Sequence, residues 1–283
     1  MVLAMCDASS SNFNITGESI VMNPYGHLPG RLYGMLPFTR LLLLLYLVVC
    51  AFWLVRCIQF RYELMNVHCM ISIVLGLFFI DTAIKLVELN SYNSIGVHPP
   101  ILTIVSILIG ALTRSVTRAL TMVVTMGYIM LYNSLIISLG ISKPSVGKKA
   151  WIVLGLSITY FILSFWDSYM NTFSPSTEVN LYRVIPATLV DSLIFITILQ
   201  SLMQNIDELT TKKQTSKVSV FLHLRTIMIV VVLFTSLYSV VLSYLIMEKV
   251  LDRYWKVQWL FKDGVWSSLY FFVLSSIAVS MLM

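Results

Sequence analysis

The amino-acid sequence predicts an all-α membrane protein, a seven-transmembrane helix bundle, from three observations. First, 58% of the residues are hydrophobic and only 11% are charged, whereas soluble domains carry about 25% charged residues. Second, apolar runs of about 20 residues, long enough to cross a bilayer core, recur seven times. Third, basic residues gather in alternate connections between these runs, as the positive-inside rule describes for multi-pass proteins.

Each expected span has its own character. The first follows a polar segment without a signal-peptide pattern, so we expect it to act as the insertion signal. The second, third and fifth contain ionisable residues, while the fourth is polar mainly through hydroxyl groups. The third and sixth are about 30 residues long, enough to tilt or to project beyond the lipid. The seventh follows a connection of mixed charge. The spans cover residues 36–55, 67–89, 101–131, 150–166, 183–203, 218–247 and 265–283.

Charges in the connections set the expected orientation. Residues 90–100 and 168–181 contain no Lys or Arg, so we expect a lumenal amino terminus and a cytosolic carboxyl terminus. Residues 1–35 would be a short lumenal segment and juxtamembrane linker, and residues 36–283 one seven-transmembrane domain. One connection disagrees, because residues 248–263 mix basic and acidic side chains on the expected lumenal side. The basic residues of the expected cytosolic connections are Arg56, Arg61, Lys143, Lys148, Lys149, Lys212, Lys213 and Lys217.

Several function classes are disfavoured by the sequence. The net charge of +6 arises mostly from residues between apolar runs, so we expect no nucleic-acid partner. No familiar catalytic signature is present, which predicts that the protein is not an enzyme. His and Cys residues show no ligand spacing, so we expect no metal and no cofactor. Asn14 begins an Asn-Ile-Thr sequon on the expected lumenal side and is a candidate for glycosylation.

Ionisable side chains at membrane depth are the main functional signal. A charge near the bilayer centre costs about 2.5–3.5 kcal/mol on insertion scales, so such residues usually face a bundle interior, a cavity or a partner. Spacings of three and four residues place the second-span members on one helical face and the two arginines on another. The expected charge network consists of Asp81, Lys85 and Glu88 in the second span, Arg114 and Arg118 in the third, and Asp191 in the fifth.

Two interpretations of this network stay open. In one, Asp81, Glu88 and Asp191 form the acidic wall of a hydrated cavity that opens toward the lumen, with Arg114 as counter-charge. In the other, the charges form a buried salt-bridge network that fixes helix register and holds no substrate. We expect Asp191→Asn to leave Arg114 without a partner and to lower the folded yield.

Residues spread over nearly the whole chain also resemble a known family. The juxtamembrane segment Asn23-Pro24-Tyr25-Gly26-His27-Leu28-Pro29-Gly30 is followed in order and spacing by Asp81, Glu88, Arg114-Ser115, Arg118, Gly127-Tyr128, Pro186, Asp191, Lys217, Ser219, His223, Asp263 and Trp266. This series resembles the transmembrane protein 87 branch of the Golgi seven-transmembrane family. That family carries a GOLD-type lumenal domain and is related to the lung seven-transmembrane receptors.

The resemblance implies a fold, a location and a role. The fold is a lumenal β-sandwich followed by a seven-helix bundle with a lumen-facing, polar or lipid-binding cavity. The location is the Golgi apparatus membrane, and the role is support of endosome-to-Golgi retrograde transport and Golgi organisation. The implied partners are the lipid bilayer, a phospholipid in the cavity and membrane cargo proteins. A cation channel or transporter that responds to voltage or membrane stretch is the alternative, and a ligand-sensing receptor is a third possibility.

Three departures from the family pattern bear on these expectations. Only about 20 residues precede Asn23, so we expect the lumenal sandwich to be missing. Residues 129–133 read IMLYN in place of a basic stretch, and because the sequence ends at Met283 we expect no cytosolic tail after the seventh span. Thr82 replaces a basic residue, while Lys85 supplies a positive charge one turn later. We therefore expect cargo recognition through the sandwich and sorting signals on a tail to be absent, and the local charge network to be rearranged.

Overall fold

The computed structural model describes residues 22–59, 66–125, 144–173, 181–211, 215–248 and 253–280, which form a bundle of helices. Asn14 and the end of the expected third span, residues 126–131, lie outside the described residues. The elements are α1 (Gly30–Tyr33), α2 (Met35–Gln59), α3 (Asn66–Ile95), α4 (Pro100–Thr125), α6 (Pro144–Phe173), α7 (Leu181–Thr211), α8 (Thr215–Met247), the 3₁₀ turn η1 (Trp255–Val257), the π-helical turn η2 (Leu260–Gly264) and α10 (Val265–Ser280).

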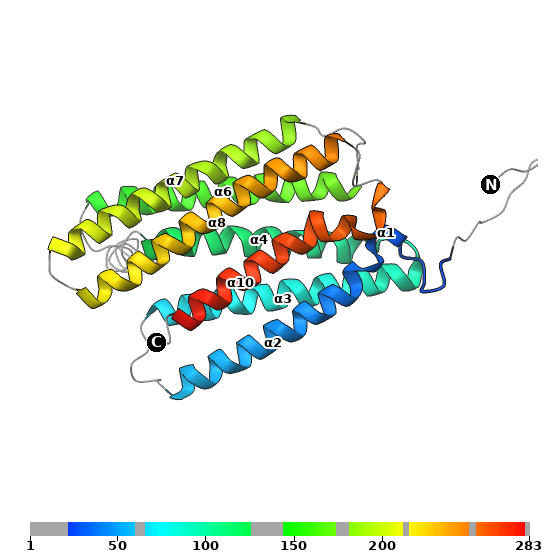
Figure 1. Cartoon of the computed structure of the whole chain (residues 1–283), viewed down its shortest axis with the longest axis horizontal. Helices are drawn as coiled ribbons and strands as arrows, with labels where there is room; N and C mark the ends of the chain where they lie inside the picture. The colour runs from blue at the N-terminus through cyan, green and yellow to red at the C-terminus, as the bar shows by residue number, and fades with distance from the viewer. Residues whose placement is uncertain are drawn as a thin grey trace, which may run out of the picture.

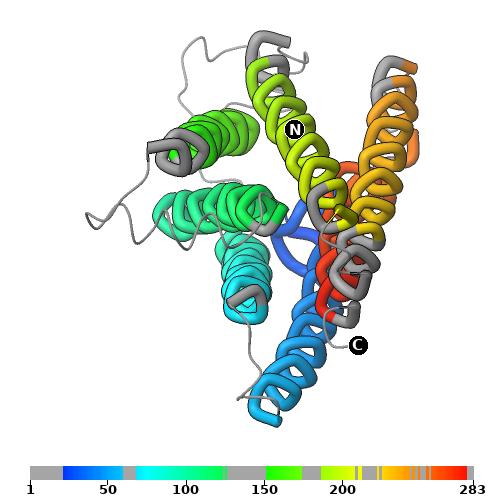
Figure 2. The backbone as a smooth tube through the Cα atoms, turned by 90° about the vertical axis from the view of Figure 1, so that its left-hand side faces the viewer, coloured from blue at the N-terminus to red at the C-terminus, as the bar shows by residue number. Residues whose placement is uncertain are grey.

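The long helices run along one common direction (Figure 1). Each packs against the next along the chain, α4 also contacts α7, and α10 closes the ring by contacting both α8 and α2. Viewed end-on, α3, α4 and α6 stack on one side, while α8 and α10 lie on the other (Figure 2). The segment before α1 bonds to the end of α3, and α1 packs against η1. We call this end of the bundle the α1 end.

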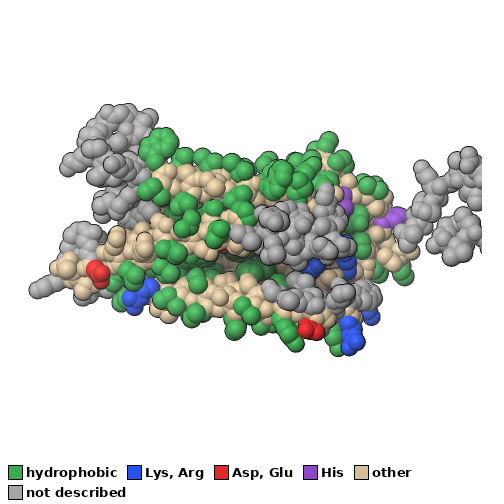
Figure 3. Space-filling view, turned by 90° about the horizontal axis from the view of Figure 1, so that it is seen from above, with side chains coloured by type: hydrophobic (Ala, Val, Ile, Leu, Met, Phe, Trp, Pro, Cys, Tyr) green, Lys and Arg blue, Asp and Glu red, His purple; other side chains and the backbone are tan. Residues whose placement is uncertain are grey.

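Length and composition confirm an all-α membrane bundle. Six described helices are long and apolar enough to cross a membrane, and α10 is a seventh helix of 16 residues that starts where the seventh span was expected. Large apolar side chains of α8, such as Leu233, Leu237 and Val240, are exposed and face outward, as contact with lipid requires. Hydrophobic side chains run along the length of the surface, and the described charged side chains on this face lie toward its two ends (Figure 3).

Side-chain hydroxyls bonded to the backbone of their own helix explain how Ser and Thr are accommodated in an apolar environment. The hydroxyl of Thr82 donates to the carbonyl of Phe78 at 2.8 Å, and the Thr117 hydroxyl donates to the Thr113 carbonyl at 2.7 Å. Such bonds satisfy polar side chains within the helix that carries them, so no water is needed at these positions.

Three apolar clusters are found among the described residues, and the two larger ones join most of the long helices. The first joins α2, α3 and α10, where the Tyr46 ring stacks 6.0 Å from Phe78 and meets the edge of Phe271 at 5.1 Å. The second joins α4, α6, α7 and α8, and we call it the α7 cluster. Its members are Met122, Val123, Val153, Tyr160, Ile194, Ile198, Leu202, Ile206 and Met228.

One residue of α3, Asn93, makes three hydrogen bonds to the segment before α1. The side-chain Nδ2 donates to the carbonyl of Tyr25 at 3.0 Å, and the side-chain Oδ1 accepts the backbone N–H of Leu28 at 3.1 Å. The backbone carbonyl of Asn93 accepts the N–H of His27 at 3.0 Å. Gly26 has φ +125°, a conformation that favours glycine, and a Cβ at this position would collide with the Asn93 side chain. The juxtamembrane segment is therefore folded onto the bundle.

Asn93→Ala should lower the free energy of unfolding by about 2 kcal/mol, because it leaves the N–H of the fully buried Leu28 without an acceptor. Thermal unfolding in detergent micelles measures the change. Asn90→Ala is the matched control, since Asn90 is exposed on the same helix. Equal stability of the two variants would show that the segment is not held by this side chain.

Candidate functional site

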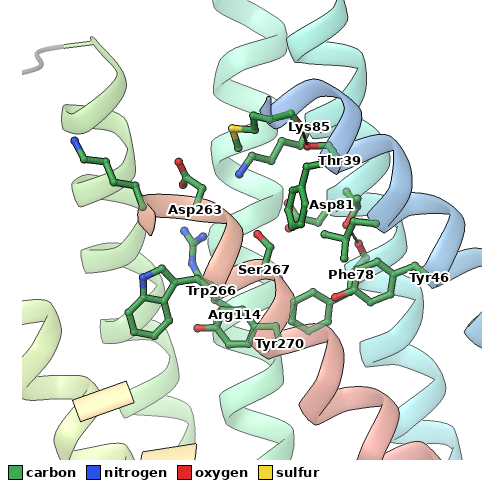
Figure 4. Close-up of a pocket in the computed structure, with 15 residues that line it drawn as sticks. Thr39, Tyr46, Phe78, Asp81, Lys85, Arg114, Asp263, Trp266, Ser267 and Tyr270 are labelled. Carbon is green, nitrogen blue, oxygen red and sulfur yellow. Dashed lines mark hydrogen bonds between the residues drawn. The ribbon is translucent and has the colours of Figure 1, made fainter. Parts of the chain in front are cut away.

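A cavity of about 250 Å³ lies between α2, α3, α4 and the segment formed by η2 and α10. Side chains from all of these elements converge on it (Figure 4). Ligand pockets for drug-sized molecules begin at roughly 300 Å³, so this one suits a small polar group with a few waters rather than an acyl chain. Its charged lining residues are Asp81, Lys85, Arg114, Lys262 and Asp263.

The α3 wall of the cavity follows from helical spacing. Phe78, Asp81, Thr82 and Lys85 recur at intervals of three and four residues and all line the cavity. Asp81 makes no ion pair within 4.0 Å among the described residues. The carboxylate therefore faces the cavity with its charge not neutralised by direct contact.

Arg114 crosses from α4 toward α6 and borders the cavity. Its Nε donates to the Ser164 hydroxyl at 3.2 Å, and its Nη2 donates to the Ser168 hydroxyl at 3.1 Å. A Cβ on Gly110 would lie 3.2 Å from Oδ1 of Asp81 and 3.7 Å from Nη1 of Arg114, so the absence of a side chain there gives both groups room. Two neutral hydroxyls hold the guanidinium, and among the described residues no carboxylate lies within 4.0 Å of it.

Arg118, one turn further along α4, makes a two-bond, partly buried ion pair with Asp191. Its Nε and Nη2 donate to the two carboxylate oxygens of Asp191 on α7, at 2.5 and 3.0 Å. The guanidinium carbon lies 4.2 Å from the centre of the Tyr160 ring on α6. The expected pairing of Arg114 with Asp191 is thus wrong, because Arg118 occupies that carboxylate and Arg114 turns toward the serines of α6.

The expected acidic wall is also rearranged. Asp81 lines the cavity, but Asp191 is committed to Arg118. Glu88 lies toward the α1 end, 3.9 Å from Nδ1 of His98, whose ring stacks on Tyr92 at 3.9 Å. The charged cavity lining contains three cations and two carboxylates, so it is cationic by one charge rather than acidic.

Sequence reasoning missed the contribution of the seventh helix to this cavity. Lys262 and Asp263 were assigned to a connection, yet they lie on η2 and line the cavity together with Trp266, Ser267 and Tyr270. The spacing of residues 263, 267 and 270 is that of one helical face, and this signal could have been found in the sequence. Within the described ranges, His, Cys, Asp and Glu side chains nowhere gather in a group of three that could hold a metal ion.

Comparison with known proteins gives one family and several relatives. The family model described as "GOST, seven transmembrane domain" matches residues 34–281. Transmembrane protein 87A of Xenopus tropicalis is 22% identical over 276 residues, covering 96% of this chain and 48% of the relative. Transmembrane protein 87B is 24% identical in Mus musculus, over 90% of this chain and 44% of the relative. Transmembrane protein 87B of Homo sapiens is 23% identical over 94% of this chain and 46% of the relative. The chain spans about half the length of the curated relatives it matches.

Proposed function

The chain belongs to the GOST seven-transmembrane family, in its transmembrane protein 87 branch, and from this premise we propose that it is a Golgi membrane protein supporting endosome-to-Golgi retrograde transport and Golgi organisation. The proposed role is not enzymatic. The amino terminus and the α1 end face the lumen, and the cavity holds the head group of a phospholipid. Membrane cargo proteins are the proposed partners.

The charge of the cavity is the observation that supports a lipid head group. Lys85, Arg114 and Lys262 outnumber Asp81 and Asp263 by one, so the lining favours a group that carries a phosphate. Arg114 is held by two hydroxyls and has no carboxylate partner among the described residues, which leaves its charge available to a ligand. Intramembrane charges that stay unpaired are costly and are usually kept for function. The acyl chains would lie in the bilayer, since the cavity is too small for them.

Arg114→Gln tests the cavity part of the proposal. We expect retention of an acyl-chain-labelled phosphatidylglycerol to weaken about tenfold, because a charged hydrogen bond to phosphate contributes about 1.5–3 kcal/mol. The measurement is binding of the labelled lipid to the full chain in micelles of an uncharged detergent. Arg56→Gln is the control, since Arg56 lies near the other end of α2 and outside the cavity. Equal retention by both variants would refute head-group binding through Arg114.

The trafficking part needs a cellular measurement. In cells depleted of the endogenous protein, steady-state Golgi recovery of an endosome-recycling cargo should fall and should be restored by this chain. The Arg114→Gln form should restore less of it if the cavity carries the role. Unchanged cargo recovery after depletion would argue against retrograde transport.

A cation channel or transporter is the second candidate, favoured by the Arg118–Asp191 pair, because the membrane potential acts on charges inside the bilayer. Beyond this pair, away from the α1 end, Met122, Ile194 and Leu202 are fully buried in the α7 cluster. An apolar plug of this kind disfavours conduction in the described conformation. Voltage-dependent cation flux in liposomes that is lost in Asp191→Asn would place this candidate first.

A further inference from the structure

The backbone hydrogen-bond spacing changes where the π-helical turn η2 leads into α10. At the end of η2 the backbone N–H of Val265 bonds to the carbonyl of Leu260, five residues back, whereas an α-helix bonds to the carbonyl four residues back. Such a π-helical turn inserts one extra residue into an α-helix, and single π turns occur frequently at functional sites. Two of the five charged cavity residues, Lys262 and Asp263, lie inside this turn.

A side chain from α8 donates a hydrogen bond to a backbone carbonyl of the π-helical turn. The shift from five-residue to four-residue bonding leaves a carbonyl in the turn without its usual N–H partner, and such a group needs another donor in an apolar environment. The hydroxyl of Tyr238 on α8 donates to the carbonyl of Phe261 at 2.5 Å. The same ring meets Trp266 edge to face at 5.8 Å and stacks on Phe234 at 6.0 Å.

Side-chain packing before and after the turn fixes the rotational position of the residues on each side of it. Before the turn, Trp259 lies 5.3 Å from Phe38 and against Gly34, where a Cβ would collide with its indole. After the turn, Trp266 and Tyr270 face the cavity. The extra residue lies between these two anchored faces. A return to α-helical bonding would rotate Trp259 by about 100° relative to Trp266, and Lys262 and Asp263 would be redirected with it.

We propose that Tyr238 is a positioning residue for the cavity: its hydroxyl holds the π-helical turn, and the turn presents Lys262 and Asp263 to the bound head group. The inference rests on the proposed head-group binding and assigns the control of its affinity to α8, a helix of which no described side chain lines the cavity. Movement of α8 against α10 would then change the charge presented by the cavity without moving Arg114. Tyr238 acts through the backbone of η2 and does not itself contact the head group.

Tyr238→Phe tests the inference because it removes the donor and keeps the ring contacts. In the full chain in detergent micelles, we expect about fivefold weaker binding of the acyl-chain-labelled phosphatidylglycerol. We also expect faster hydrogen–deuterium exchange confined to residues 260–266, with α3 unchanged. Replacing Tyr238 with 4-aminophenylalanine, which restores a donor at the same position, should reverse both effects. Tyr244→Phe is the matched control, since Tyr244 is exposed on the same helix.

The outcomes separate this inference from the proposed function. If Arg114→Gln weakens binding while Tyr238→Phe changes neither binding nor exchange, head-group binding stands and the positioning role is refuted. A change in exchange without a change in binding, or the reverse, also refutes it, because the turn would then not set the affinity. If Arg114→Gln has no effect on binding, the proposed head-group binding itself is refuted, and the positioning role that rests on it is refuted too. Should Tyr238→Phe not yield folded protein, Lys262→Gln replaces it, and unchanged binding there overturns the inference.

Discussion

Replacing Arg118 with alanine is expected to lower the free energy of unfolding by about 3–5 kcal/mol, the largest single effect that we predict. The guanidinium donates two hydrogen bonds to Asp191 and lies over the Tyr160 ring, so it joins α4, α6 and α7. Its removal leaves the carboxylate at membrane depth without a cation. Thermal or denaturant unfolding in detergent micelles, followed by tryptophan fluorescence, measures the loss.

Arg56→Ala is the control for this experiment. Arg56 also lies over an aromatic ring, 5.6 Å from the centre of Phe52, but no carboxylate pairs with it in the described part of the chain. Its loss should cost less than about 1 kcal/mol. If Arg118→Ala is no less stable than Arg56→Ala, the ion pair does not hold the bundle together.

The double variant Arg118→Met with Asp191→Leu should recover most of the stability, because a buried ion pair is often replaced by apolar residues at little cost, whereas breaking it from one side is expensive. Recovery would identify the single-variant loss as the cost of an unpaired charge at membrane depth. A double variant as unstable as Arg118→Ala would instead assign the loss to packing of the guanidinium on Tyr160.

The second large effect is expected at Gly34, the residue between α1 and α2. Gly34→Ala should lower the free energy of unfolding by about 3 kcal/mol, because the added Cβ would overlap the rigid indole of Trp259. The backbone does not contribute, since φ −65° and ψ −20° at Gly34 are open to any residue. Displacement of Trp259 should separate the start of α2 from the segment leading into η2, which the same unfolding measurement detects.

Gly155→Ala on α6 is the matched control. A Cβ there meets nothing within 4 Å, and alanine is favoured over glycine inside a helix by up to about 1 kcal/mol. The two substitutions are chemically identical and are expected to change stability in opposite directions. A stable Gly34→Ala variant would mean that Trp259 can move aside, and the anchor proposed before the π-helical turn would be lost with it.

Much of the architecture was predictable because it depends on local composition. A bilayer requires long apolar runs with internally bonded backbone, so the number and approximate position of the spans follow from hydropathy alone. Asp81 and Lys85 share a helical face in any α-helix, and the structure places both on the cavity. The π-helical turn at residues 260–264 was not predictable in this way, because it depends on Tyr238 of another helix and on Trp259 against Gly34.

The sequence by itself determined the membrane class, the approximate spans, the family resemblance and the presence of charges at membrane depth. Only the tertiary structure decided which charges meet. Four residues advance an α-helix by about 6 Å and turn it about 40° past a full turn, so Arg114 and Arg118 share a face in sequence terms but point to different neighbours. Arg118 reaches Asp191 on α7, and Arg114 reaches the serines of α6 beside the cavity. That difference arises from the rotation and depth of α4 against α6 and α7, which packing between distant residues fixes and local sequence does not encode.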